Sequence, residues 1–67
     1  MLGEHIRKLR HQKGLSQEAL AEGADIHRNF LGVIERGQKG ITLETLFRLS
    51  RALGVTPQSI ITAIYEY

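Results

Sequence analysis

One face of a predicted helix over residues 28–35 carries side chains suited to hydrogen bonding and apolar contact with a partner. At 100° per residue, the apolar side chains of this helix fall within about 100° of arc. They are Phe30, Leu31 and Ile34. The opposite face carries Arg28, Asn29, Gly32, Val33 and Arg36. This mixture is unusual for a helix that contacts only water, and it suits a helix that lies in a groove and contacts hydrogen-bonding edges and methyl groups.

The segment Ser16–Gly37 is predicted to form a short helix, a tight turn and then the helix described above. Residues 15–27 carry three carboxylates and no Lys or Arg, whereas residues 28–40 carry three cations against one carboxylate. The formal net charge of the chain is only +2 at pH 7. Interspersed surface charge explains this distribution as well as a nucleic-acid surface does, so charge alone leaves both interpretations open.

Four helix starts repeat one pattern, in which an apolar residue precedes the cap and packs on the fourth helical residue. Three of them have hydroxyl caps: Leu15-Ser16 with Leu20, Ile41-Thr42 with Leu46, and Val55-Thr56 with Ile60. The fourth pairs Ile26 with Leu31 and places the cap at His27, with Asp25 as the alternative. Histidine is a poor cap, and we favour His27 because an unusual residue is tolerable there if its side chain has another task.

The other predicted helices span residues 3–13, 43–53 and 57–65. Gly14 and Gly54 follow the first two, where a left-handed cap residue is wanted. Helix 43–53 has more apolar surface than one stripe and is expected to be central to the core. Because there are no strand-like alternations, repeats or linkers, the predicted fold class is all-α, with five short helices in one compact domain over residues 1–67.

Composition limits the chemistry open to this chain. Its 67 residues include no Cys, so neither a disulfide nor a Cys-based zinc site is available. His5, His11 and His27 are the only plausible bases or metal ligands, and no GxSxG, P-loop or HExxH motif is present. We therefore expect no enzyme activity, no metal and no cofactor. No apolar run approaches about 18 residues and no signal peptide is visible, so we expect a cytoplasmic protein without membrane contact.

Four motifs follow one another along the chain. They are Ile6-Arg7-Lys8-Leu9-Arg10, Gly14-Leu15-Ser16-Gln17-Glu18-Ala19-Leu20-Ala21, Ile34-Glu35-Arg36-Gly37, and Leu43-Glu44-Thr45-Leu46 running to Ala52-Leu53-Gly54-Val55. In this order and spacing they resemble the Cro/C1-type (XRE-like) helix-turn-helix domains of phage repressors, bacterial regulators and restriction–modification controller proteins. The resemblance covers nearly the whole chain. It implies a five-helix, lambda-repressor-like DNA-binding domain in which helices 2 and 3 form the helix-turn-helix and helix 3 enters the DNA major groove.

The resemblance also implies roles for individual residues. The base-reading candidates are Arg28, Asn29, Gly32 and Val33. The candidates for contact with the DNA backbone are Gln17, His27, Arg36, Gln38, Lys39 and Thr42. Arg10 and Glu35 are expected to form a partly buried ion pair that ties helix 3 to the scaffold. Plainer interpretations remain open: solvated helix-end residues for Arg28 and Asn29, tolerated apolar exposure for Val33, and ordinary loop residues for Gln38 and Lys39.

Departures from the family pattern at three positions affect the helix-turn-helix. The turn carries Asp25 where the family usually has glycine, and Asp can adopt the left-handed conformation at some cost. Gly23 lies near the end of helix 2 and is expected to weaken it by about 1 kcal/mol relative to Ala. Gly32 occupies a position on helix 3 that often bears a side chain. It either allows close approach to DNA or removes one reading contact.

The last predicted helix carries more apolar residues than the domain's own core needs. Ile61 and Tyr65 form a second ridge beside Ile60 and Ile64, so a homodimer through Ile61, Ile64 and Tyr65 is expected. The sequence therefore favours a dimeric, double-stranded DNA-binding transcriptional regulator, a repressor or controller, that reads an inverted repeat and takes no small-molecule ligand. The alternative is an antitoxin-like or other helical protein-interaction module with weak DNA binding, which a gel shift would distinguish.

Overall fold

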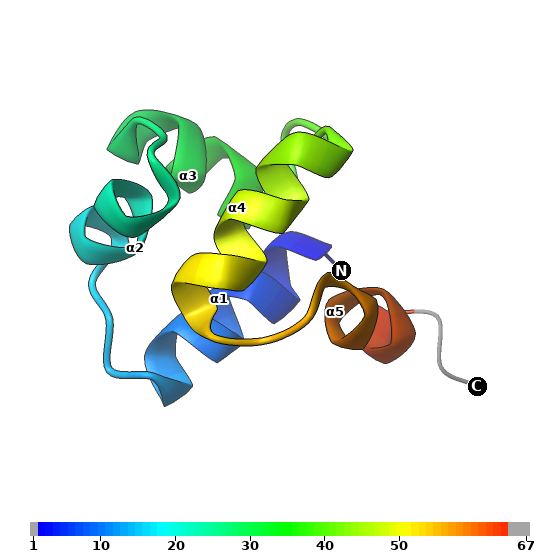
Figure 1. The fold of residues 1–67 in the computed structure, drawn as a ribbon. Coiled ribbons are helices and arrows are strands. Elements are labelled where there is room, and N and C mark those ends of the chain that lie inside the picture. The colour runs from blue at the N-terminus through cyan, green and yellow to red at the C-terminus, as the bar shows by residue number, and fades with distance from the viewer. Residues whose placement is uncertain (1, 65–67) are drawn as a thin grey trace.

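Residues 2–64 are described by a computed structural model and form a bundle of short helices without strands (Figure 1). The helices are α1 (Leu2–Gln12), α2 (Gln17–Ala24), α3 (Arg28–Glu35), α4 (Leu43–Leu53) and α5 (Pro57–Ile64). The expected all-α architecture is confirmed. The first helix begins and ends one residue earlier than predicted, and the predicted end of the last helix at residue 65 lies outside the described residues.

Helix α4 lies at the centre of the bundle, as its apolar content predicted (Figure 1). It packs against α2 and α5, while α1 packs against α3 and α5. The core side chains are Ile6, Leu20, Ala21, Ala24, Leu31, Ile34, Leu49 and Leu53. Gly23 of α2 faces α4, because a Cβ placed on it would lie 3.3 Å from Cβ of Ala52. The glycine that weakens α2 therefore also allows α2 and α4 to pack closely.

The four predicted caps are all present. The hydroxyl oxygens of Ser16, Thr42 and Thr56 accept hydrogen bonds from backbone N–H groups three residues later, at 3.0–3.1 Å. His27 caps α3, and its Nδ1 accepts from the N–H of Asn29 at 3.0 Å.

Asp25 forms the turn between α2 and α3 in the left-handed conformation, with φ 57° and ψ 45°. The N–H of Ile26 donates to the carbonyl of Ala21 at 2.9 Å, which closes the end of α2. Arg48 of α4 also stabilises the turn, because its Nη1 donates a hydrogen bond to the carbonyl oxygen of Asp25 at 3.1 Å. The helix-turn-helix is therefore fixed by backbone geometry and by the central helix.

A glycine near the start of the chain allows α1 to cross directly over the end of α3. A Cβ placed on Gly3 would overlap the carbonyl oxygen of Ile34 and would lie 2.8 Å from that of Glu35. These are backbone atoms at the end of α3, so no side-chain movement can make room. Sequence reasoning did not identify this position, because the contact joins segments about 30 residues apart.

Candidate nucleic-acid interface

The base-reading candidates lie together on the outward face of α3, although they differ in accessibility. Arg28 and Asn29 are exposed, and Val33 is half-buried. Gly32 is buried, which is unexpected for a residue that was expected to allow close approach of α3 to DNA. The structure thus brings two hydrogen-bonding side chains and one apolar side chain to one exposed face, and covers the glycine between them.

Arg28 is held by the preceding helix. Its Nη1 lies 3.2 Å from Oε1 of Glu18 in the first turn of α2, and both side chains are exposed. Exposed ion pairs contribute about 0–1 kcal/mol, so this contact orients Arg28 without preventing it from binding another partner.

The cover over Gly32 is the guanidinium of Arg36. A Cβ on Gly32 would lie 3.2 Å from Nη1 of Arg36 and 3.9 Å from Nε2 of Gln17. Nε of Arg36 donates to Oε1 of Gln38 at 3.2 Å. Two residues assigned to backbone contact are therefore bonded to each other, and one of them lies across the centre of the α3 face.

A buried ion pair anchors the C-terminal end of α3 to α1. Nε of Arg10 lies 2.8 Å from Oε2 of Glu35, and Nη2 donates to Oε1 at 3.1 Å. Nη1 of Arg10 donates to the carbonyl of Leu15 at 3.0 Å, so the same guanidinium also holds the loop before α2. Both paired side chains are buried.

Gln17 adds a second donor to this carboxylate, with Nε2 3.1 Å from Oε1 of Glu35. Burial alone would raise the pKa of Glu35, but hydrogen bonds from Arg10 and Gln17 and the charges of Arg10 and Arg7 outweigh it. The pKa of the Glu35 carboxyl is therefore held below its ordinary value. The side-chain amide of Gln17, assigned to backbone contact, is engaged within the protein.

The other candidates for backbone contact lie at the start of α3, in the loop after it and at the start of α4. Lys39 lies exposed in the loop between α3 and α4, beside Gln38. The hydroxyl of Thr42 is used as the cap of α4, and Nδ1 of His27 as the cap of α3. Any anion at these two helix starts would be met by backbone N–H groups and the positive end of the helix dipole.

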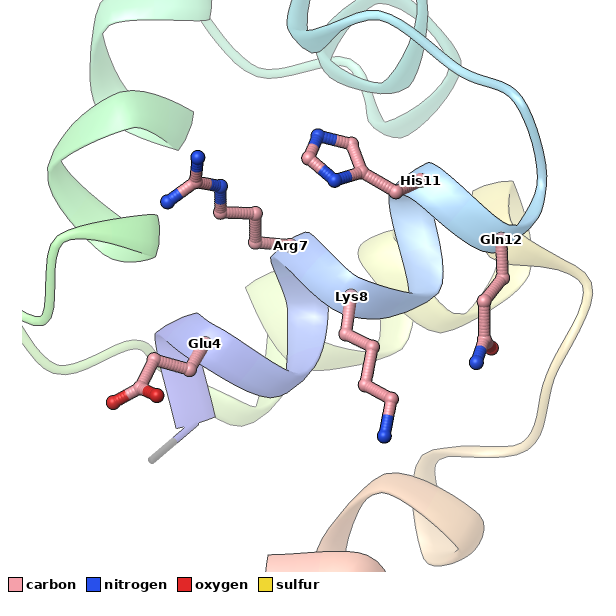
Figure 2. Close-up of a pocket in the computed structure, with 5 residues that line it drawn as sticks. All are labelled: Glu4, Arg7, Lys8, His11 and Gln12. Atoms are coloured by element: carbon pink, nitrogen blue, oxygen red, sulfur yellow. The ribbon is translucent and has the colours of Figure 1, made fainter.

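Helix α1 adds a basic surface that the predicted residue roles did not include. Figure 2 shows Arg7 and His11 extending to one side of α1, and Lys8 and Gln12 to the other. Arg7 lies close enough to the end of α3 for its charge to lower the pKa of Glu35. The sequence signal was available, since Arg7 stands one helical turn before Arg10 on the predicted helix.

Large apolar side chains are exposed on α4 and α5. They are Leu43 at 67%, Phe47 at 52% and Ile61 at 40% relative exposure. Leu43, Ile61 and Ile64 line one groove, together with Leu2, Ile41, Thr42 and Leu46. The structure thus groups the expected interface residues Ile61 and Ile64 and adds Leu43 and Leu46 of α4. Tyr65, the third expected member, lies outside the described residues.

Two further features of residues 2–64 bear on the class of site. None of the helices there is both long and apolar enough to cross a membrane. Nor does that part of the chain bring three or more His, Asp or Glu side chains together as a metal site.

Comparison with known proteins places this geometry in a family. Residues 6–60 match the sequence family described as helix-turn-helix. Control protein C.SmaI of Serratia marcescens is 39% identical over 62 residues, which are 92% of this chain and 74% of that protein. The restriction–modification controller protein C.AhdI from Aeromonas hydrophila superposes with a TM-score of 0.86 at 39% identity, over 88% of this chain and 89% of that one.

A second solved structure has the same arrangement of helices. The master regulator for biofilm formation SinR, solved in complex with DNA, superposes with a TM-score of 0.86 at 31% identity, over 91% of this chain and 98% of that one. The match of the family to residues 6–60, the identity to C.SmaI and the two superpositions agree with one another. The chain therefore belongs to the Cro/C1-type helix-turn-helix family.

Proposed function

We propose that this protein is a sequence-specific, double-stranded DNA-binding transcriptional regulator that places α3 in the major groove. The observation that carries the proposal is the outward face of α3, where Arg28 and Asn29 are exposed on a helix anchored at its C-terminal end by a buried ion pair. A rigid support matters because base recognition depends on placing a few side chains accurately against base edges. Membership of the helix-turn-helix family supports the same function.

The protein is proposed to act as a homodimer. One helix in one groove reads only a few base pairs, which is too little to select a site among many competing ones. The apolar surface lined by Leu43, Ile61 and Ile64 is suited to a second copy of the chain, because a two-fold axis would place the same patch on both partners. The DNA site would then be an inverted repeat with half-sites centred about 34 Å apart.

Selection from a random pool of double-stranded DNA tests the proposal directly. We expect enrichment of an inverted repeat, bound in a gel shift far more tightly than unrelated DNA of the same length. Sedimentation of the complex should give two protein copies per site. Equal binding to all DNA, with no enriched sequence, would contradict the proposal and favour the protein-interaction alternative, in which the same apolar surface holds a different protein.

A further inference from the structure

The outward face of α3 has a gap at Gly32, and the side chain of Arg36 fills it. A Cβ placed on Gly32 would lie 3.2 Å from Nη1 of Arg36 and 4.0 Å from its Cζ. Residues four apart stand one above the other on a helix, and their side chains lean toward the N-terminus, so Arg36 lies back over the turn that contains Gly32. The guanidinium is thereby carried from the end of α3 to the middle of its outward face.

Gln38 holds the guanidinium in this orientation. Its Oε1 accepts a hydrogen bond from Nε of Arg36 at 3.2 Å. Arginine has five N–H donors in a planar fork, and once the Nε–H is donated to Gln38, the two terminal nitrogens carry the other four. Such a pair of donors can bind two acceptors at once, on the edge of a guanine or on a phosphate.

The position of the fork favours a base over a phosphate. Gly32 lies on the same arc of α3 as Arg28, Asn29 and Val33, so a guanidinium above it stands among the base-reading candidates. Lys39, by contrast, lies in the exposed loop beyond the end of α3. We propose that Arg36 is itself a base-reading residue, which binds O6 and N7 of a guanine from its position over Gly32, with Gln38 as its positioning residue. The inference rests on the proposed function.

This assignment also explains the glycine. Glycine is among the least favourable residues in a helix interior, so its presence on α3 calls for a compensating role. A Cβ at position 32 would lie 3.2 Å from Nη1 of Arg36, which is tighter than ordinary van der Waals contact, so the guanidinium would have to move outward. Gly32 then contacts no base, and its role is to admit Arg36.

Site selection with a small set of variants tests the inference. Arg36→Ala should lower affinity for the wild-type site by roughly 5- to 150-fold and remove the preference for guanine at one position of each half-site. Gly32→Ala removes no charge and improves helix propensity, yet it should weaken the preference at that same position, because a Cβ 3.2 Å from Nη1 makes the guanidinium shift by a few tenths of an ångström. Arg36→Lys keeps the charge but lacks the fork, so it should lose the preference as well. The control is Lys39→Ala, which should weaken binding to all sequences alike.

The alternative, a phosphate contact by Arg36, predicts a different pattern. Arg36→Ala would then weaken every sequence by one factor, reduce the salt slope by about one unit and leave all base preferences unchanged, and this result would overturn the inference. Retention of the full preference by Arg36→Lys would also overturn it. A thermal melt of Gly32→Ala at or above that of wild type excludes misfolding as the cause of lost preference. If wild type itself enriches no sequence, both the proposed function and this inference are wrong. If wild type enriches a site and the Arg36 variants keep the same base preference, only this inference is wrong.

Discussion

The guanidinium of Arg10 lies against the carboxylate of Glu35, with Nε 2.8 Å from Oε2 and Nη2 3.1 Å from Oε1. The two residues are 25 positions apart and join α1 to the last residue of α3. Planar two-point contacts of this kind fix direction as well as distance. The orientation of the α3 face is therefore set by a bond on the inner side of the helix.

Breaking this pair should destabilise the domain strongly. Glu35→Gln leaves the buried Arg10 charge without its partner, which typically costs about 3–5 kcal/mol. In a domain of this size we expect the melting temperature to fall by more than about 10 °C. Glu22→Gln, which removes an exposed carboxylate, is the control and should melt near wild type. A melt of Glu35→Gln within a few degrees of wild type would show that the pair contributes little.

The same pair predicts how stability depends on pH. Because the pKa of Glu35 is lowered in the folded protein, its contribution is complete above the unfolded value of about 4.3 and is lost as the pH falls through the folded pKa. The difference in unfolding free energy between wild type and Glu35→Gln should therefore be constant near neutral pH and shrink below about pH 4. Urea titrations of both proteins between pH 3 and 7 would measure it. A difference that stays constant to pH 3 would contradict the assignment.

Gly3 is expected to be intolerant of any side chain. In Gly3→Ala the new Cβ would collide with backbone oxygens at the end of α3, so α1 must shift, at a cost of about 1–3 kcal/mol. Thermal melts should show a decrease of at least about 4 °C. Gly40→Ala is the matched control, because a Cβ there has nothing within 4 Å. Equal melting of the two variants would show that α1 accommodates the methyl group.

Local signals explain how much of this fold was predictable. Caps, staples and glycine stops act within a few residues, so the bounds of α2, α3 and α4 follow from the sequence. The environments of Gly3, Leu43 and Phe47 could not be predicted, because they depend on how the helices cross. Leu43 and Phe47 belong to the apolar surface that was expected to make α4 central to the core, whereas the structure exposes both. At the site, exposed faces followed from periodicity, while the bond between Arg36 and Gln38 depends on side-chain conformations in a loop.

Variants of His27 test whether this residue contacts DNA in addition to capping α3. His27→Asn replaces a weak cap by a strong one and should melt at or above wild type, while His27→Ala should lose about 0.5–2 kcal/mol. If His27 also contacts DNA, as the sequence predicts, His27→Asn should bind its preferred site more weakly despite its stability. His11→Asn, exposed on α1, is the control for replacing a histidine. Wild-type stability in His27→Ala would show that the hydrogen bond to Asn29 contributes nothing.

Base reading by α3 predicts a contrast between two kinds of variant. Arg28→Ala and Asn29→Ala should each lower specific affinity by about 1–3 kcal/mol and relax the preference at particular base pairs. Lys39→Ala should weaken binding to all sequences and reduce the salt slope by about one unit. Gel shifts at several salt concentrations, on preferred and altered sites, separate the two effects. An Arg28→Ala protein with unchanged affinity and unchanged preference would rule out α3 as the reading helix.

The apolar surface on α4 and α5 predicts the state of assembly. Ile61 is partly exposed on α5 and lines the same groove as Leu43, so a charge placed there would have to be buried between two copies of the chain. Burying an unpaired carboxylate is strongly unfavourable, and Ile61→Glu should therefore yield a folded monomer. Since a monomer contacts only one half-site at a time, its affinity for the inverted repeat should fall steeply, while its affinity for a single half-site should match that of wild type.

Ser59→Glu provides a matched control for this variant. It adds the same charge to the same helix two residues earlier, about 200° away around the axis, at a position where Glu is compatible with the Thr56 cap. Sedimentation at micromolar concentration should find wild type and Ser59→Glu dimeric and Ile61→Glu monomeric, with all three giving folded circular dichroism spectra. A monomeric wild type that also binds its preferred DNA as one copy per site would contradict the dimer. An Ile61→Glu protein that remains dimeric would place the interface elsewhere on the molecule.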